Sequence, residues 1–269
     1  MHKEHPLKEL VRKQKIGVPM GICSVCSSHP YVIEAAIEKA VEENTYVLIE
    51  ATANQVNQYG GYTGMPPRDF VKFVQSISDK KGLARKRVIL GGDHLGPLVW
   101  KNEDESTAMK KAEELIASYV KAGFSKIHID TSMHLGSDDK SKKLEDCTIA
   151  QRAARLYEVA EQTYKTSKNK IYYRPIYVIG SEVPVPGGTQ KDEELKVTEV
   201  TDLEDTLFCF QKEFNQVVPE DFFHNIIAVV VQPGVEFGEG NIHEYNREAA
   251  IELSTYIKRN DNLVFEGHS

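Results

Sequence analysis

The residues best suited to chemistry in this 269-residue chain are histidines and carboxylates that follow short aliphatic runs. His94, Glu182 and His268 offer two imidazoles and a carboxylate, a donor set suited to zinc or to manganese, cobalt or nickel. Asp93 lies beside His94, where it could act as a general acid or base, and Gly91–Gly92 leaves room for a ligand to approach the backbone. We therefore expect a divalent metal site, although its ligands are far apart in the sequence.

Further polar residues stand at the ends of the other aliphatic runs. Glu50 and Asp130 are additional catalytic candidates because carboxylates can move protons. A single polar residue at a strand end is more often a loop anchor, and a buried histidine such as His128 is usually a satisfied core residue. Because such residues recur on seven runs in succession, we nevertheless expect them to line a functioning or ancestral active site. The substrate-binding candidates are Ser24, Asn54, Asn57, Ser132, Arg174 and Gln232.

The elements that must position these residues alternate along the chain. Apolar residues with helical spacing predict helices over residues 32–41, 70–77 and 109–120. Pro30 and Pro67 suit the first turn of a helix, Thr201–Glu204 matches a capping box, and Gly123 is a plausible helix stop. The stretch between Glu182 and Asn225 is predicted to be a long loop before a helix. Aliphatic runs rich in β-branched residues predict seven strands: Ile16–Ser24, Tyr46–Thr52, Arg87–Asp93, Lys126–Ser132, Ile171–Ile179, Asn225–Gln232 and Asn262–Glu266.

Strict alternation of strands and helices predicts a parallel sheet with helices outside it. No linker or change of composition divides the chain, so we expect residues 1–269 to form a single α/β domain, a (β/α) barrel of the TIM type. Seven strands are one fewer than such a barrel has. An open doubly wound sheet is the alternative, but no GxGxxG motif follows the first predicted strand.

Composition and charge exclude several classes of protein. The chain is 41% hydrophobic and 27% charged, which is typical of globular proteins. Its net charge of −7 and the absence of a basic tract argue against a nucleic-acid or anionic membrane partner. The longest aliphatic run, Ile226–Val231, is far shorter than the roughly 20 residues that cross a bilayer. With no secretory signal at the charged N-terminus, a cytoplasmic location is expected.

Four cysteines are too few for a disulfide scaffold in a chain of this length, and the expected compartment is reducing. Cys23 and Cys26 have CxxC spacing, but no second pair or histidine pair accompanies them at zinc-finger spacing. We interpret them as two small apolar side chains at a strand end.

Six motifs make the chain recognisable. They are Gly21–His29, Ile49–Asn57, Gly60–Met65, Gly91–Pro97, His128–Met133 and Phe265–Ser269. With them the chain resembles, over essentially its whole length, the GatZ/KbaZ family of tagatose-bisphosphate aldolase subunits, once described as tagatose-6-phosphate kinases. A kinase is disfavoured, because there is no Walker A loop, no kinase glycine-rich loop and no basic cluster for a nucleotide.

The resemblance implies a TIM barrel related to class II aldolases and a role in galactitol, N-acetylgalactosamine or tagatose catabolism. It implies a sugar phosphate substrate and a catalytic partner subunit of the GatY/KbaY type, which the family member supports without catalysing the reaction itself. It also implies His94, Glu182 and His268 as ligands and Asp93 as the acid/base, since this Asp-His pair resembles the one on the third strand of class II aldolases. Chains of the family continue past the Gly-His-Ser motif, so we expect this chain to stop before the eighth strand.

Three functions remain open on these residues. The first is a subunit of class II tagatose-1,6-bisphosphate aldolase. The second is a metal-dependent 4-epimerase of a ketohexose or its 6-phosphate, which would break and re-form the C3–C4 bond with the same metal and the same aspartate. The third is a scaffold without enzymatic activity that stabilises a catalytic partner.

Overall fold

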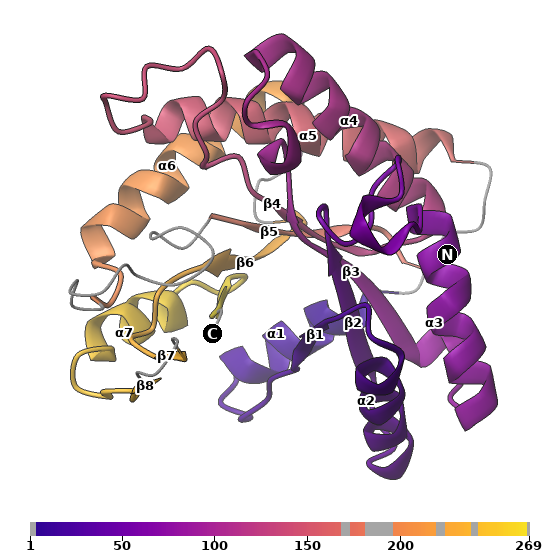
Figure 1. The fold of residues 1–269 in the computed structure, drawn as a ribbon. Coiled ribbons are helices and arrows are strands. Elements are labelled where there is room, and N and C mark those ends of the chain that lie inside the picture. Colours follow the sequence, from indigo (N-terminus) through magenta and orange to yellow (C-terminus); the bar gives the residue numbers. More distant parts are fainter. Residues whose placement is uncertain (1–3, 168–172, 181–195, 219–223, 238–241, 268–269) are drawn as a thin grey trace.

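The computed structural model describes residues 4–167, 173–180, 196–218, 224–237 and 242–267. Seven strands form a parallel sheet in the order β1-β2-β3-β4-β5-β6-β9, so neighbours in the sheet follow one another along the chain. The sheet is curled around a central lumen, and helices cover its outside (Figure 1). The predicted α/β class and the predicted parallel sheet of seven strands are confirmed. Within the described residues β1 and β9 are its two edges.

The bounds of the elements follow the predicted alternation. The strands of the sheet are β1 (Ser24–Cys26), β2 (Val47–Thr52), β3 (Val88–Leu95), β4 (Lys126–Ile129), β5 (Ile176–Ile179), β6 (Ile226–Val230) and β9 (Val264–Glu266). A separate two-stranded ribbon consists of β7 (Glu236–Phe237) and β8 (Ile242–His243). The helices are α1 (Pro6–Lys15), α2 (Pro30–Glu42), α3 (Pro67–Lys81), α4 (Glu105–Ala122), α5 (Asp146–Thr166), α6 (Val200–Val217) and α7 (Ile251–Arg259).

The ends of the helices bear out part of the sequence analysis. Pro30 and Pro67 are the first residues of α2 and α3, and Gly123 ends α4 in the left-handed conformation with φ 102°. The predicted capping box at Thr201–Glu204 is wrong. Helix α6 already begins at Val200 and has Glu199 as its N-cap, which makes no side-chain capping bond.

The first predicted strand, Ile16–Ser24, is also wrong. Strand β1 only begins at Ser24, and Ile16 follows directly on the helix α1. Ile16, Val18 and Met20 look like strand residues because they alternate with other residues, yet their side chains are exposed. Apolar residues therefore alternate with other residues in this segment although the segment is not a strand with one buried face.

Helix α1 closes the lumen at the amino ends of the strands. Its buried Leu7 and Val11, one turn apart, belong to an inner apolar cluster with lumen-facing residues of β2, β3, β5 and β6. Lys8 Nζ donates to the side chain of Asn225, just before β6, at 3.1 Å, and Lys15 Nζ donates to the carbonyl of Ile257 in α7 at 2.7 Å. The helix therefore ties together elements that lie more than 200 residues apart. A second, larger apolar cluster fills the space between the sheet and the outer helices. Among the described helices none has the length and apolar character of a membrane span.

His5, the N-cap of α1, makes the stability of this closure depend on pH. Its Nδ1 accepts from the Leu7 N–H at 3.1 Å, and its Nε2 lies 3.1 Å from Ser125 Oγ. Burial, aided by the charge of Lys8, lowers the pKa of His5 to about 3. Between that pH and the ordinary value of 6.5 the unfolded chain therefore binds a proton that the folded chain does not, and stability falls as the pH falls.

We expect the free energy of unfolding to drop by about 2 kcal/mol between pH 7 and pH 5 through this residue. His5→Asn keeps an acceptor for the Leu7 N–H but cannot be protonated, so this part of the pH dependence should vanish in urea titrations of the variant. His29→Asn changes an exposed histidine and is the matched control. Equal slopes in wild type and His5→Asn would refute the prediction.

The structure contains a disulfide that the sequence analysis did not predict. Cys147 of α5 is bonded to Cys209 of α6, across 62 residues of sequence, whereas Cys23 and Cys26 are free thiols. Both free cysteines are exposed, and they lie at strand β1 as expected: Cys23 directly precedes it and Cys26 ends it. Cys26 ends β1, and its thiol donates to Gln55 Oε1 at 3.7 Å.

Reduction of the Cys147–Cys209 bond should lower the free energy of unfolding by about 2–4 kcal/mol, because a cross-link closing a long loop restricts the unfolded chain. Urea unfolding with and without a phosphine reductant measures the effect. The double variant Cys147→Ser/Cys209→Ser should be insensitive to the reductant, and Cys23→Ser should behave as wild type. A wild type whose unfolding is unchanged by the reductant would contradict the expectation.

Candidate active site in the barrel lumen

The carboxyl end of β3 presents Asp93 and His94 to the lumen. The register between β3 and β4 shifts between Gly92 and Leu95, and His94 has a φ of 47°, in the left-handed region. A non-glycine residue there costs about 1–2 kcal/mol. The backbone N–H of His94 is held in this conformation by donating to His128 Nδ1 at 3.2 Å. Local strain and the shifted register together turn the imidazole of His94 toward β4.

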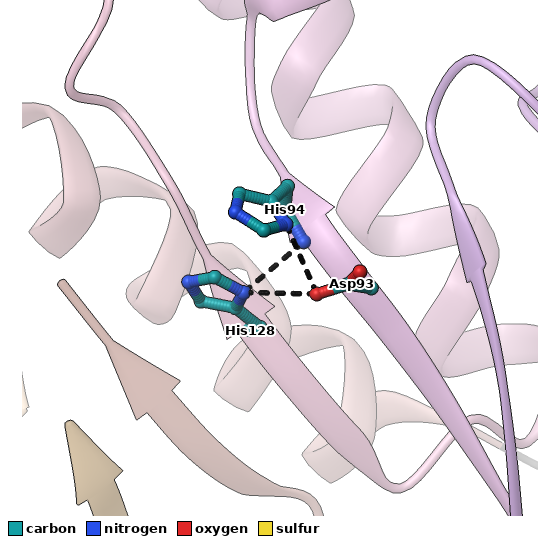
Figure 2. A group of neighbouring side chains, drawn as sticks. All are labelled: Asp93, His94 and His128. Atoms are coloured by element: carbon teal, nitrogen blue, oxygen red, sulfur yellow. Dashed lines mark hydrogen bonds and ion pairs between the residues drawn. The ribbon is translucent and has the colours of Figure 1, made fainter. Parts of the chain in front are cut away.

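Asp93, His94 and His128 form a compact cluster (Figure 2). Asp93 Oδ1 lies 3.0 Å from His94 Nδ1 and 3.2 Å from His128 Nδ1. The His128 ring is fully buried, and the other two side chains are largely buried. The three residues offer ligand atoms that all lie within 4.8 Å of one another. These are donor types and separations that a first-row divalent ion can use, because ligand atoms about 2.1 Å from one tetrahedral ion are about 3.4 Å apart.

The hydrogen bonds of His128 add to the evidence for a cation. Its Nε2 lies 2.8 Å from the carbonyl oxygen of Gly180, which can only accept, so Nε2 carries a proton. In a neutral imidazole Nδ1 is then a lone pair, which agrees with its acceptance of the His94 N–H. That lone pair also faces Asp93 Oδ1 at 3.2 Å. Asp93 Oδ1 and His128 Nδ1 therefore need a proton or a metal ion between them: with a proton the ring donates to Asp93, and with a divalent ion both atoms are ligands.

Asp93 is ionised in this setting. Burial by itself would raise its pKa, but hydrogen bonds and charge from His128 and His94 outweigh burial and hold the pKa of Asp93 well below its ordinary value. An ionised carboxylate suits a metal ligand and can also accept a hydrogen bond or a proton from a substrate hydroxyl.

The two glycines before Asp93 do not open the backbone to a ligand, contrary to the expectation. A Cβ built on Gly91 would lie 2.1 Å from Glu50 Oε1, and one on Gly92 would lie 2.3 Å from Leu95 Cδ1. The space that a side chain would take is thus filled by neighbouring side chains of the protein. Gly91 is required because the carboxylate of Glu50 lies across it.

Deeper in the lumen Glu50, Lys126 and Glu266 form a buried charge network. Lys126 Nζ lies 2.8 Å from Glu50 Oε1 and 2.7 Å from Glu266 Oε1. Lys126 and Glu50 are fully buried, and Glu266 nearly so. The network joins β2, β4 and the last strand β9 across the lumen.

Charge and burial oppose each other in this network. Burial raises the pKa of Glu50 to about 7, although the Lys126 ammonium acts to lower it. Burial acts to lower the pKa of Lys126, but the carboxylates of Glu50 and Glu266 outweigh it, and the net effect is a raised pKa. Lys126 is therefore a permanent cation at neutral pH, which rules out a role as a neutral amine nucleophile.

Other predicted site residues have local structural contacts. Asp130, just after β4, is buried and accepts from the Ser132 N–H at 3.0 Å and from Ser132 Oγ at 2.7 Å. Asn57 donates to the Ala53 carbonyl and accepts from the N–H groups of Tyr59 and Gly61. These side chains shape the loops after β4 and β2, as loop anchors do.

The remaining substrate-binding candidates are spread over the barrel. Gln232, after β6, is buried and accepts from the Gly234 N–H, and Ser24 is half-buried at the start of β1. Asn54 is exposed in the loop after β2. Arg174 precedes β5, and its Nη2 donates to Glu161 of α5 at 2.6 Å. It is thus at the amino end of its strand and bonded to an outer helix, so the structure does not bring it to the cluster.

Two of the three predicted ligands, Glu182 and His268, lie outside the described residues. The structure instead adds His128, Lys126 and Glu266, which the sequence analysis did not include among the site residues. The period of two in His128-Ile-Asp130 placed His128 on the lumen face, and the same period extends back to Lys126. A lysine that begins a short strand and shares its face with His128 was the signal that could have identified the buried network.

Comparison with known proteins identifies the relatives of this chain. The model of the D-tagatose-1,6-bisphosphate aldolase subunit GatZ/KbaZ-like family matches residues 7–269. A D-tagatose-1,6-bisphosphate aldolase subunit GatZ of Salmonella gallinarum is 48% identical over 264 residues, which are 98% of this chain and 61% of the relative. A D-tagatose 6-phosphate 4-epimerase of Agrobacterium fabrum is 47% identical over the same shares of the two chains.

A solved structure agrees with these matches. The crystal structure of a probable tagatose 6 phosphate kinase from Sinorhizobium meliloti superposes with a TM-score of 0.81 and 44% identity, over 93% of this chain and 59% of the other. The chain spans about three fifths of the length of these relatives.

Proposed function

Because the chain belongs to the D-tagatose-1,6-bisphosphate aldolase subunit GatZ/KbaZ-like family, we propose that it acts within a class II tagatose-1,6-bisphosphate aldolase and supports a catalytic GatY/KbaY-like partner. The observation that carries the proposal is the Asp93–His94–His128 cluster in the lumen of a barrel of this family. The proposed setting is cytoplasmic breakdown of galactitol, N-acetylgalactosamine or tagatose.

His94 would hold a divalent ion together with Asp93 and His128, and zinc is the ion that we propose for this mixed nitrogen and oxygen set. Glu182 and His268 remain proposed ligands from the sequence. When bound, such an ion polarises a ketose carbonyl and stabilises the negative charge that develops on its oxygen.

Within the assembled aldolase, Asp93 is the group that we propose to handle the substrate proton. It would take the proton of the C4 hydroxyl, C4 would become the aldehyde carbon as the C3–C4 bond breaks, and the electron pair of that bond would pass to C3 and the C2 oxygen. Transfer of that proton from Asp93 to C3 then gives glycerone phosphate beside glyceraldehyde 3-phosphate. Glu50 lies too deep to touch a substrate while it is paired with Lys126, so we propose for it an electrostatic role.

A 4-epimerase is the second candidate, and the Agrobacterium fabrum relative that bears this name favours it. Cleavage of C3–C4, rotation of the retained aldehyde and reunion of the two carbons would invert C4. The chemistry is the same, and the two functions differ in whether the aldehyde leaves.

The test is an NMR product assay with the Zn²⁺-loaded chain, alone and with a catalytic class II tagatose-bisphosphate aldolase subunit. The expected result is no triose phosphate from the chain alone and a severalfold gain in the activity and half-life of the partner. A partner whose activity and half-life are unchanged would refute the subunit proposal. Conversion of tagatose 6-phosphate to fructose 6-phosphate by the chain alone would establish the epimerase instead.

A further inference from the structure

The lumen holds a second set of acidic oxygens, and a lysine already occupies it. Glu50, Asp93 and Glu266 each place a carboxylate oxygen within 4.8 Å of the other two. Carboxylate oxygens alone are the donors that hard divalent ions such as Mg²⁺ and Mn²⁺ prefer. The cation that lies against Glu50 and Glu266 is the ammonium of Lys126, at 2.8 and 2.7 Å.

Three carboxylates this close together are unstable without a positive charge. Buried like charges repel one another strongly because little water screens them. Lys126 is fully buried, and it brings one positive charge to a group of three carboxyl side chains. It lies two residues before His128, so both side chains point into the lumen from β4. The lysine therefore lies deeper in the lumen than the Asp93–His94–His128 cluster, nearer the amino ends of the strands.

We propose that Lys126 is a positioning residue that decides where a divalent ion binds in the lumen. Because its ammonium pairs with Glu50 and Glu266, these two carboxylates are not available to bind a metal ion. Asp93 then binds the ion together with the two histidines. The consequence is one ion per lumen, in a mixed site that favours zinc or cobalt over manganese or magnesium. This inference rests on the metal site of the proposed function.

Lys126→Met tests the proposal, because it removes the charge and keeps much of the volume. The protein would first be loaded with one equivalent of Co²⁺ and then titrated with Mn²⁺, with free Mn²⁺ followed by electron paramagnetic resonance. We expect wild type to take up no tight Mn²⁺, and Lys126→Met to bind one equivalent at least tenfold more tightly than any further site in wild type. The second change in Lys126→Met/Glu266→Gln should abolish that gain.

The visible absorption of bound Co²⁺ gives a second readout that a purely structural lysine would not affect. The absorption band of bound Co²⁺ should change in Lys126→Met, because Glu50 and Glu266 no longer pair with an ammonium group and can bind the ion. Lys142→Met removes an exposed lysine, 81% accessible, and is the matched control for charge.

Three results would overturn the inference. Tight binding of a second ion by wild type would contradict it without any variant, and so the test does not depend on the folding of Lys126→Met. A folded Lys126→Met that gains no Mn²⁺ and keeps the wild-type Co²⁺ spectrum would contradict it as well. So would a gain that survives Glu266→Gln. Wild type that binds no ion at all would instead refute the proposed metal site, so the two failures are distinguishable.

Discussion

His94→Asn should lower the affinity of the chain for Zn²⁺ or Co²⁺ by at least about a hundredfold while leaving the fold intact. The variant loses the imidazole that lies 3.0 Å from Asp93 Oδ1. Asparagine tolerates the left-handed backbone at this position better than most residues do, so the change should not add strain at the end of β3. Competition with a chromophoric chelator measures the affinity, and thermal unfolding measures the fold.

His29→Asn is the matched control, because this side chain is exposed at the start of α2 and makes no capping bond. His128→Asn should weaken the ion as well, since it removes the second imidazole of the cluster. Wild-type affinity in both His94→Asn and His128→Asn would exclude the cluster as the metal site. His268→Ala tests the ligand that only the sequence predicts.

Leu7→Asp should lower the free energy of unfolding by about 4 kcal/mol or more. Leu7 is buried at the amino end of the lumen against residues of the strands, so the variant loses the burial of the side chain and also buries a carboxylate without a partner. Urea unfolding monitored by circular dichroism measures the change. A loss of this size is comparable to the whole stability of many domains.

Leu7→Met keeps the volume and should cost less than about 1.5 kcal/mol. Leu7→Asp with the stability of Leu7→Met would mean that α1 does not need to occupy the lumen, and would contradict the assigned inner cluster.

The order of the strands was predictable because the apolar runs are separated by helical stripes of the right length. The ends of the sheet were not equally predictable. Helix α1 packs Leu7 and Val11, together with the partly buried Leu10, against the inner cluster, and three apolar residues among charged ones give only a short periodic signal. The residues after α1 alternate like a strand without being buried, because alternation records side-chain polarity and not the presence of a neighbouring strand.

The candidate site was predictable by residue type and only partly by contact. Asp93 and His94 are adjacent in the sequence, and the structure brings His128 to them because β3 and β4 are neighbours in the sheet. The pairing of Lys126 with Glu50 and Glu266 depends on where three strands stand around the lumen, which spacing along one strand does not reveal. Asn57 was predicted to bind substrate because it is a polar residue near a strand end. In the structure its side chain instead makes hydrogen bonds within its own loop.

The contacts of α1 also affect how the chain folds while the ribosome is synthesising it. This helix is synthesised before its partners Ser125, Asn225 and Ile257, which follow 120 or more residues later in the chain. Until then its apolar face has no lumen to enter, and contacts of such long range form slowly because the chain must close a large loop. Helix α1 can therefore dock fully only after these later segments have been made, and until then the nascent chain must keep its apolar face from other apolar surfaces.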